Sequence, residues 1–137
     1  MRIMGLDVGQ KRIGIALSDP LGWTAQGHSV LQLNLKDDLS RIKALCLENE
    51  VSLIVVGWPL NMNGTEGPKA MEIKQYAHEL REFTGLPVEL WDERLTTVTA
   101  EKILIQADVS RRKRKLVIDK MAATFILQSY LDSHAGR

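Results

Sequence analysis

The sequence predicts an α/β domain built on a mixed five-stranded sheet, with an antiparallel three-strand meander, two parallel strands and flanking helices. Three observations predict this class. Three strand-like runs with short connections open the chain, and short connections favour antiparallel neighbours. Helical and strand-like patterns then alternate, which is typical of parallel strands joined by helical crossovers. The 137 residues, 45% of them hydrophobic, suit one domain spanning residues 1–137.

The three opening strands are predicted by alternation of their side chains. The run Arg2–Asp7 alternates between two faces, and Asp7 is the carboxylate that ends it. The run Arg12–Ser18 alternates isoleucine and leucine with small residues. A third run, Gly22–Leu33, is interrupted by Gly27, so its strand is less regular.

The rest of the chain shows helical spacing and short apolar runs in turn. Met121, Phe125 and Tyr130 recur near helical spacing and are expected in the core. The expected segments are a helix around Leu39–Cys46, a buried strand over Leu53–Val56, a helix over Pro68–Phe83, a strand over Val88–Trp91, and helices over Thr97–Ala107 and Leu116–Leu131.

Composition excludes several classes of protein. No apolar run approaches the ~20 residues of a membrane span, and an acid appears before any signal-like stretch develops. The single cysteine, Cys46, excludes an internal disulfide, and with three dispersed histidines it excludes a Cys/His zinc cage. We therefore expect a cytoplasmic protein.

The charge distribution indicates a polyanionic partner. The net charge is only +1, but five of the 18 basic residues are consecutive and contain no acid among them. Such a block is either a solvated loop or a contact for nucleic acid, whose phosphates would offset the mutual repulsion. The block consists of Arg111, Arg112, Lys113, Arg114 and Lys115.

Three places in the sequence offer candidate functional carboxylates: two single aspartates and one pair of acids. Asp7 ends an otherwise apolar strand, where the alternative role is a turn cap before Gly9. Asp119 lies on the apolar side of the last helix, where the alternative is a favourable charge in the first turn. Asp92 and Glu93 follow the fifth strand.

These acids are expected to converge, because ligands collect at the carboxyl ends of parallel strands in an open sheet. Clustered carboxylates repel one another unless a divalent cation neutralises them, and oxygen ligands suit Mg²⁺ or Mn²⁺. Paired ions of this kind activate water against a phosphodiester. The inferred chemistry is metal-dependent phosphodiester hydrolysis.

Four stretches resemble the YqgF family, also called RuvX. They are Asp7–Gly14 (DVGQKRIG), Gly57–Gly67 (GWPLNMNGTEG), Asp92–Thr97 (DERLTT) and Asp119–Ala123 (DKMAA), and the resemblance covers essentially the whole chain. It implies an RNase H-like fold and a nuclease that matures the 5′ end of pre-16S ribosomal RNA. An older description of the family is Holliday junction resolvase. The alternatives are therefore a resolvase-type DNA endonuclease or a nucleic-acid-binding module with little catalysis.

The resemblance also implies the catalytic acids and metal ligands, which transfer onto Asp7, Glu93 and Asp119. Glu93 is preferred to Asp92 because alternation would place Trp91 and Glu93 on one face. The better-known RuvC resolvases carry an acid after the fourth strand and two acids three residues apart on the last helix. Here the fourth strand ends in Gly57 without an acid, so fewer ligands and weaker metal binding are expected.

Further residues are expected to contact nucleic acid, an RNA precursor being favoured and branched DNA possible. Lys11, Arg12 and Arg94 would contact phosphates together with the basic block 111–115. The loop Trp58–Pro68 is either a lid over the site or a rigid connection to the next helix. Its candidate contacts are Asn61, Asn63 and Gly64.

Overall fold

The computed structural model describes residues 1–33, 37–96, 105–107, 110, 112–113 and 121–134. Its strands and helices come in the order β1 (Arg2–Val8), β2 (Arg12–Ser18), β3 (Ala25–Gln32), α1 (Asp38–Glu48), β4 (Val51–Trp58), α2 (Pro68–Thr84), β5 (Val88–Asp92) and α5 (Ala122–Ser133).

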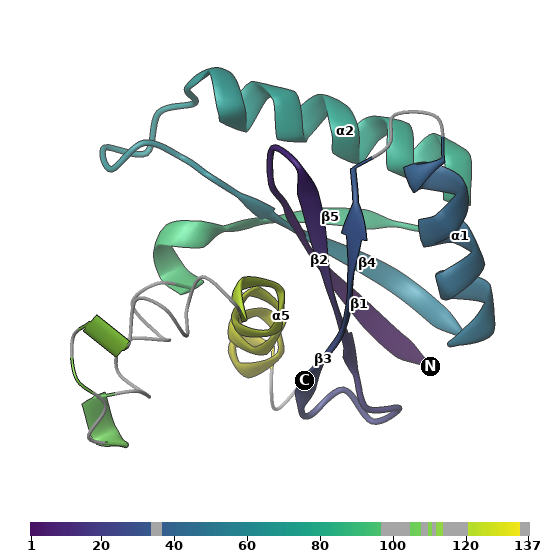
Figure 1. Cartoon of the computed structure of the whole chain (residues 1–137), viewed down its shortest axis with the longest axis horizontal. Helices are drawn as coiled ribbons and strands as arrows, with labels where there is room; N and C mark the ends of the chain where they lie inside the picture. Colours follow the sequence, from purple (N-terminus) through teal and green to yellow (C-terminus); the bar gives the residue numbers. More distant parts are fainter. Residues whose placement is uncertain (34–36, 97–104, 108–109, 111, 114–120, 135–137) are drawn as a thin grey trace.

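The five strands form one mixed sheet in the order β3-β2-β1-β4-β5. The pairs β1–β2 and β2–β3 are antiparallel, whereas β1–β4 and β4–β5 are parallel. The expected meander followed by two parallel strands is therefore confirmed. Figure 1 shows β4 and β5 ending on the same side of the molecule, where the loop before α2 lies above the turn that follows β5.

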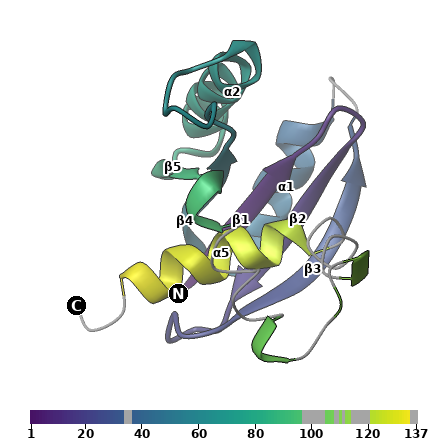
Figure 2. The same cartoon turned by 90° about the vertical axis from the view of Figure 1, so that its left-hand side faces the viewer.

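Helices cover both faces of the sheet, as Figure 2 shows. On one face α1 and α2 pack over a cluster that includes Met4, Ile54 and Leu80, none of which is exposed. The hydroxyl of Tyr76 on α2 donates to the buried carboxylate of Asp38 on α1 at 3.1 Å, which ties the two helices together. No described helix is long and apolar enough to cross a membrane.

On the other face α5 lies directly against strand backbone. A Cβ added at Gly5 of β1 would stand 2.7 Å from Cβ of Leu127, and one added at Gly57 of β4 would stand 2.5 Å from Cδ1 of Ile126. Real Cβ atoms essentially never come this close to another heavy atom, so α5 can approach the sheet this closely only because Gly5 and Gly57 have no side chains. A Cβ added at Gly14 would stand 3.4 Å from Cβ of Ala123, so the start of α5 lies over the end of β1 and the beginning of β2.

Most expected elements are confirmed, with boundaries shifted by a few residues. The third strand begins at Ala25, because Asp19 Oδ1 accepts hydrogen bonds from the backbone N–H groups of Trp23 and Thr24 and closes a turn. Of the three residues expected in the core, Tyr130 is confirmed, whereas Met121 is 42% exposed just before α5 begins and Phe125 is half-buried and belongs to neither core cluster. The expected helix over 97–107 and the start of that over 116–131 lie largely outside the described residues.

Candidate active site

Asp7 lies at the carboxyl end of β1, on the face that α5 covers. It pairs in register with Gly14 of β2, and a Cβ added at Gly14 would stand 3.8 Å from Cβ of Asp7. The Asp7 side chain is half-buried. Because Gly14 has no side chain, space remains beside the Asp7 carboxylate, and partial burial limits the access of water to it.

Glu93 reaches the same place from the end of β5. The strand ends at Asp92, and a helical turn over residues 93–96 follows. A Cβ added at Gly57 would stand 2.8 Å from Glu93 Oε1 and 3.2 Å from Glu93 Cγ, so the Glu93 side chain lies over the backbone of β4. Because β4 lies between β1 and β5, this position directs Glu93 toward Asp7.

The electrostatics agree with this geometry. Burial first, and then the negative charge of Asp7, raise the pKa of Glu93 to about 7, while Lys69 at the start of α2 acts in the opposite direction. Desolvation and a neighbouring like charge both disfavour the ionised form of a carboxyl group. The two acids are thus close enough for their charges to interact.

This acid pair suits a divalent cation. Its donors are carboxylate oxygens, which Mg²⁺ and Mn²⁺ prefer, and a bound cation would offset both the desolvation and the repulsion that disfavour ionised Glu93. No group of three or more potential ligands occurs among the described residues. Asp119, the third expected ligand, lies outside them.

A cleft of about 640 Å³ opens beside Asp7, between the sheet and the start of α5. Lys11 and Arg12, two of the expected nucleic-acid contacts, line it, and both are exposed. His28 on β3 lies along the same cleft and forms a 2.9 Å hydrogen bond with the hydroxyl of Ser29. The cleft therefore joins the candidate catalytic carboxylate Asp7 to a rim that carries two basic side chains.

Arg94 is placed differently from Lys11 and Arg12. Its guanidinium pairs with Asp92, with Nη2 2.7 Å from Asp92 Oδ2, and these hydrogen bonds hold the pKa of Asp92 below its usual range. Its Nη1 donates to the carbonyl of Met62 at 3.1 Å. Asp92 is thus engaged with Arg94, whereas Glu93 faces Asp7.

The loop between β4 and α2 is hydrogen-bonded within itself. The Asn61 amide donates to Thr65 Oγ1 at 3.0 Å, and the Asn63 carboxamide oxygen accepts from the Thr65 backbone and hydroxyl. Gly64 has φ +86°, a left-handed conformation that favours glycine. These contacts favour the rigid alternative for the loop over the lid.

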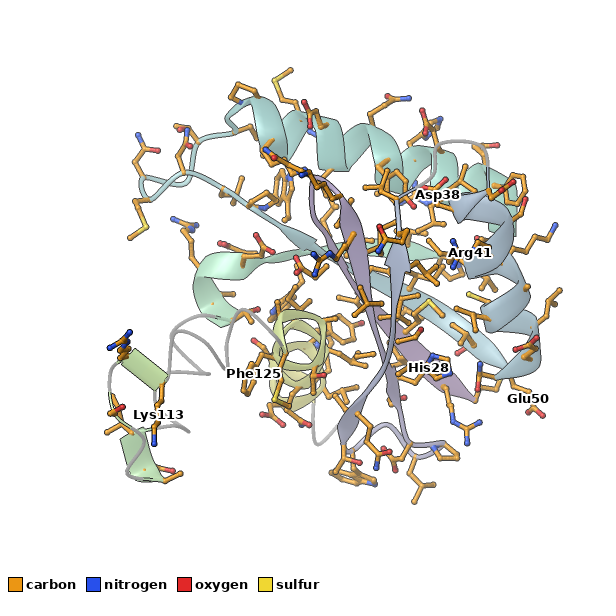
Figure 3. All side chains as sticks on the ribbon, viewed as in Figure 1. His28, Asp38, Arg41, Glu50, Lys113 and Phe125 are labelled. Atoms are coloured by element: carbon orange, nitrogen blue, oxygen red, sulfur yellow. The ribbon has the colours of Figure 1, made fainter. Side chains whose placement is uncertain are left out.

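Two residues of the basic block, Arg112 and Lys113, belong to the described part of the chain. Arg112 and Lys113 are exposed. Figure 3 shows Lys113 on a segment outside the sheet, well separated from His28. Arg111, Arg114 and Lys115 lie outside the described residues.

One residue of the site was not singled out from the sequence as part of it. Gly57 leaves the space that Glu93 fills, whereas the sequence indicated it only as part of the stretch Gly57–Gly67 and as the end of a strand that lacks an acid. The available signal was its position, because it ends a buried strand between the two strands whose ends carry Asp7 and Glu93.

The fold defines the structural class of the protein first. A solved structure titled "T. thermophilus RuvC in complex with Holliday junction substrate" matches with a TM-score of 0.61 at 12% identity, covering 99% of this chain and 97% of that one. A fowlpox virus Holliday junction resolvase matches with a TM-score of 0.51 at 17% identity, covering 97% and 99%. The chain therefore has the RNase H-like fold of RuvC-type resolvases.

Sequence comparison identifies the family. The profile of RuvX, described as Holliday junction resolvase, matches residues 1–133, so the chain belongs to the RuvX family. A relative from Syntrophomonas wolfei, named "Putative pre-16S rRNA nuclease", is 61% identical over 133 residues, covering 96% of this chain and 94% of that protein. A relative of the same name from Listeria monocytogenes is 62% identical over 136 residues, covering 97% and 99%.

Proposed function

We propose that this protein is a metal-dependent nuclease that hydrolyses phosphodiester bonds of RNA in 5′-end maturation of pre-16S rRNA. The observation that carries the proposal is the position of the Glu93 carboxylate over Gly57, directed toward Asp7 at the edge of a basic-rimmed cleft. Relatives more than 60% identical over nearly the whole chain carry the name of that activity. With this substrate, the location we propose is the cytoplasm, where ribosome precursors are processed.

Asp7 and Glu93 would hold Mg²⁺ or Mn²⁺, with Asp119 as the proposed third ligand. A divalent cation held there would supply water activation and would stabilise negative charge on the leaving oxygen. Lys11 and Arg12 would hold the phosphate backbone along the cleft, and residues 111–115 would add affinity by neutralising further phosphates. The chain's own residues thereby position one phosphodiester beside the acid pair.

Cleavage of two substrates tests the proposal. Purified wild type, Asp7→Asn and a control, Glu79→Gln, which changes an exposed acid on α2, are each incubated with a labelled pre-16S 5′ fragment and a four-way DNA junction. Each reaction contains Mg²⁺, Mn²⁺ or EDTA.

We expect wild type and Glu79→Gln to cleave the RNA only with metal, and Asp7→Asn to leave it intact. Cleavage of the junction alone would instead assign a resolvase activity. If neither substrate is cut while wild type and Asp7→Asn bind RNA equally, the protein is a binding module and the proposed catalysis is wrong.

A further inference from the structure

Asp92 and Arg94, the residues on either side of Glu93 in the chain, are hydrogen-bonded to each other. The backbone N–H of Arg94 donates to Asp92 Oδ1 at 2.9 Å, and its Nε lies 3.1 Å from both carboxylate oxygens. Nη2 donates to Asp92 Oδ2 at 2.7 Å. Backbone and side chain of Arg94 thus close a short ring across residue 93, which limits the directions in which Glu93 can point.

The same guanidinium reaches the loop before α2. Nη1 donates to the Met62 carbonyl at 3.1 Å, across 32 residues of sequence. A Cβ added at Gly64 would stand 3.5 Å from Arg94 Nη1 and 3.6 Å from Nη2, so the guanidinium lies against the loop backbone. This contact joins the end of β5 to the loop that leaves β4.

The loop that Arg94 contacts is a unit of its own. Asn61 N–H donates to the Thr65 carbonyl at 2.9 Å, and Gly64 N–H donates to the Asn61 carbonyl at 2.8 Å. At its far end, Lys74 pairs with Glu66 at 3.0 Å without involving β5. Fixing one carbonyl near the tip therefore restrains the whole turn.

We propose that Asp92 and Arg94 form a strap that fastens the loop 59–67 to the turn carrying Glu93, and that Arg94 is a positioning residue for the nuclease site. Its effect on cleavage rests on the proposed function, but its effect on the loop does not. The opposing interpretation is that Arg94 contacts a substrate phosphate directly. Asp92→Asn separates the two, because it weakens the strap while leaving the arginine available to a phosphate.

The first experiment measures backbone hydrogen exchange at Asn61, Gly64 and Thr65 in protein without RNA. Asp92→Asn, Arg94→Gln and Arg94→Lys are compared with wild type and with Lys74→Met, which removes the ion pair to Glu66 at the far end of the loop. Lysine cannot bind both carboxylate oxygens and the Met62 carbonyl in the same planar geometry. We expect exchange at these amides to accelerate on the order of tenfold in all three strap variants and to be unchanged in Lys74→Met.

The second experiment measures kcat and KM for RNA cleavage with the same variants and with the double variant Asp92→Asn/Arg94→Gln. The strap predicts that Asp92→Asn and Arg94→Gln lower kcat alike with little change in KM, and that the double variant is no slower than either.

Exchange unchanged in both Asp92→Asn and Arg94→Gln would overturn the strap. So would wild-type kcat in Asp92→Asn together with a raised KM in Arg94→Gln, because that pattern belongs to a direct phosphate contact. If wild type fails to cleave RNA at all, the proposed nuclease function fails, and the exchange measurements still decide on the strap.

Discussion

Substitution of Glu93 by glutamine should stabilise the metal-free protein while it abolishes catalysis. Burial and the charge of Asp7 raise the pKa of Glu93 from 4.5 to about 7 in the folded protein. The fold therefore favours the protonated acid. Its contribution to stability is fully present below the unfolded pKa and is lost as the pH rises through about 7. Glutamine carries no charge and should not show this loss.

The magnitude follows from the shift in pKa. A rise in the pKa of Glu93 from 4.5 to about 7 means that ionisation of this group lowers the free energy of unfolding by about 3 kcal/mol at high pH. Because Glu93 is only half-buried, solvent screening reduces this to about 1–2 kcal/mol. For a chain of this length that is an increase in Tm of about 3–8 °C.

Thermal unfolding in EDTA at pH 5 and pH 8 measures the effect. We expect Glu93→Gln to exceed wild type in Tm at pH 8 and to approach it at pH 5. Mg²⁺ should raise the Tm of wild type at pH 8 but not that of the variant. Glu89→Gln, an exposed acid earlier on β5, is the matched control and should change neither value. A variant less stable than wild type at pH 8, or equally displaced at both pH values, would refute the reasoning.

Three further predictions concern the same site. Mg²⁺ affinity, measured by calorimetry, should fall by up to about tenfold for each pH unit below 7, because protons compete for Glu93, and should level off above it; an affinity constant from pH 5.5 to 8 would contradict this. Gly57→Ala should lose about 10–100-fold in kcat, because the new Cβ would stand 2.5 Å from Ile126 Cδ1 and 2.8 Å from Glu93 Oε1 and would displace both side chains; a wild-type rate would show that the space at Gly57 is unimportant for the site. Lys11→Gln and Arg12→Gln should each reduce the slope of log K for RNA binding against log salt concentration by about one; an unchanged slope would show that the RNA does not contact these residues.

Local pattern was sufficient to predict most of the fold. Alternation and helical spacing are properties of neighbouring residues, and they predicted the meander and the strands β4 and β5. The start of β3 was placed too early because the Asp19 side chain closes the preceding turn, which alternation does not register. Met121 was misplaced because periodicity does not mark where a helix begins.

The candidate site was harder to predict from the sequence than the fold, because its contacts join residues far apart in the chain. Alternation placed Glu93 on the face of Trp91, and the Glu93 side chain does lie on that face, although the strand has already ended. The role of Gly57 depends on two neighbouring strands that only the sheet order brings together. The bond from Arg94 to Met62 joins residues 32 positions apart, and no spacing rule indicates it.

The most direct test of the central claim is a double-mutant cycle on the two carboxylates. RNA cleavage is measured for wild type, Asp7→Asn, Glu93→Gln and the double variant at saturating Mg²⁺. If both acids serve one metal-dependent step, each single variant should lose nearly all activity and the double variant should be no slower than the slower single one. A double variant whose loss in cleavage rate equals the product of the two single losses would contradict the assignment of Asp7 and Glu93 to one active site. Substantial cleavage by Asp7→Asn would also contradict it.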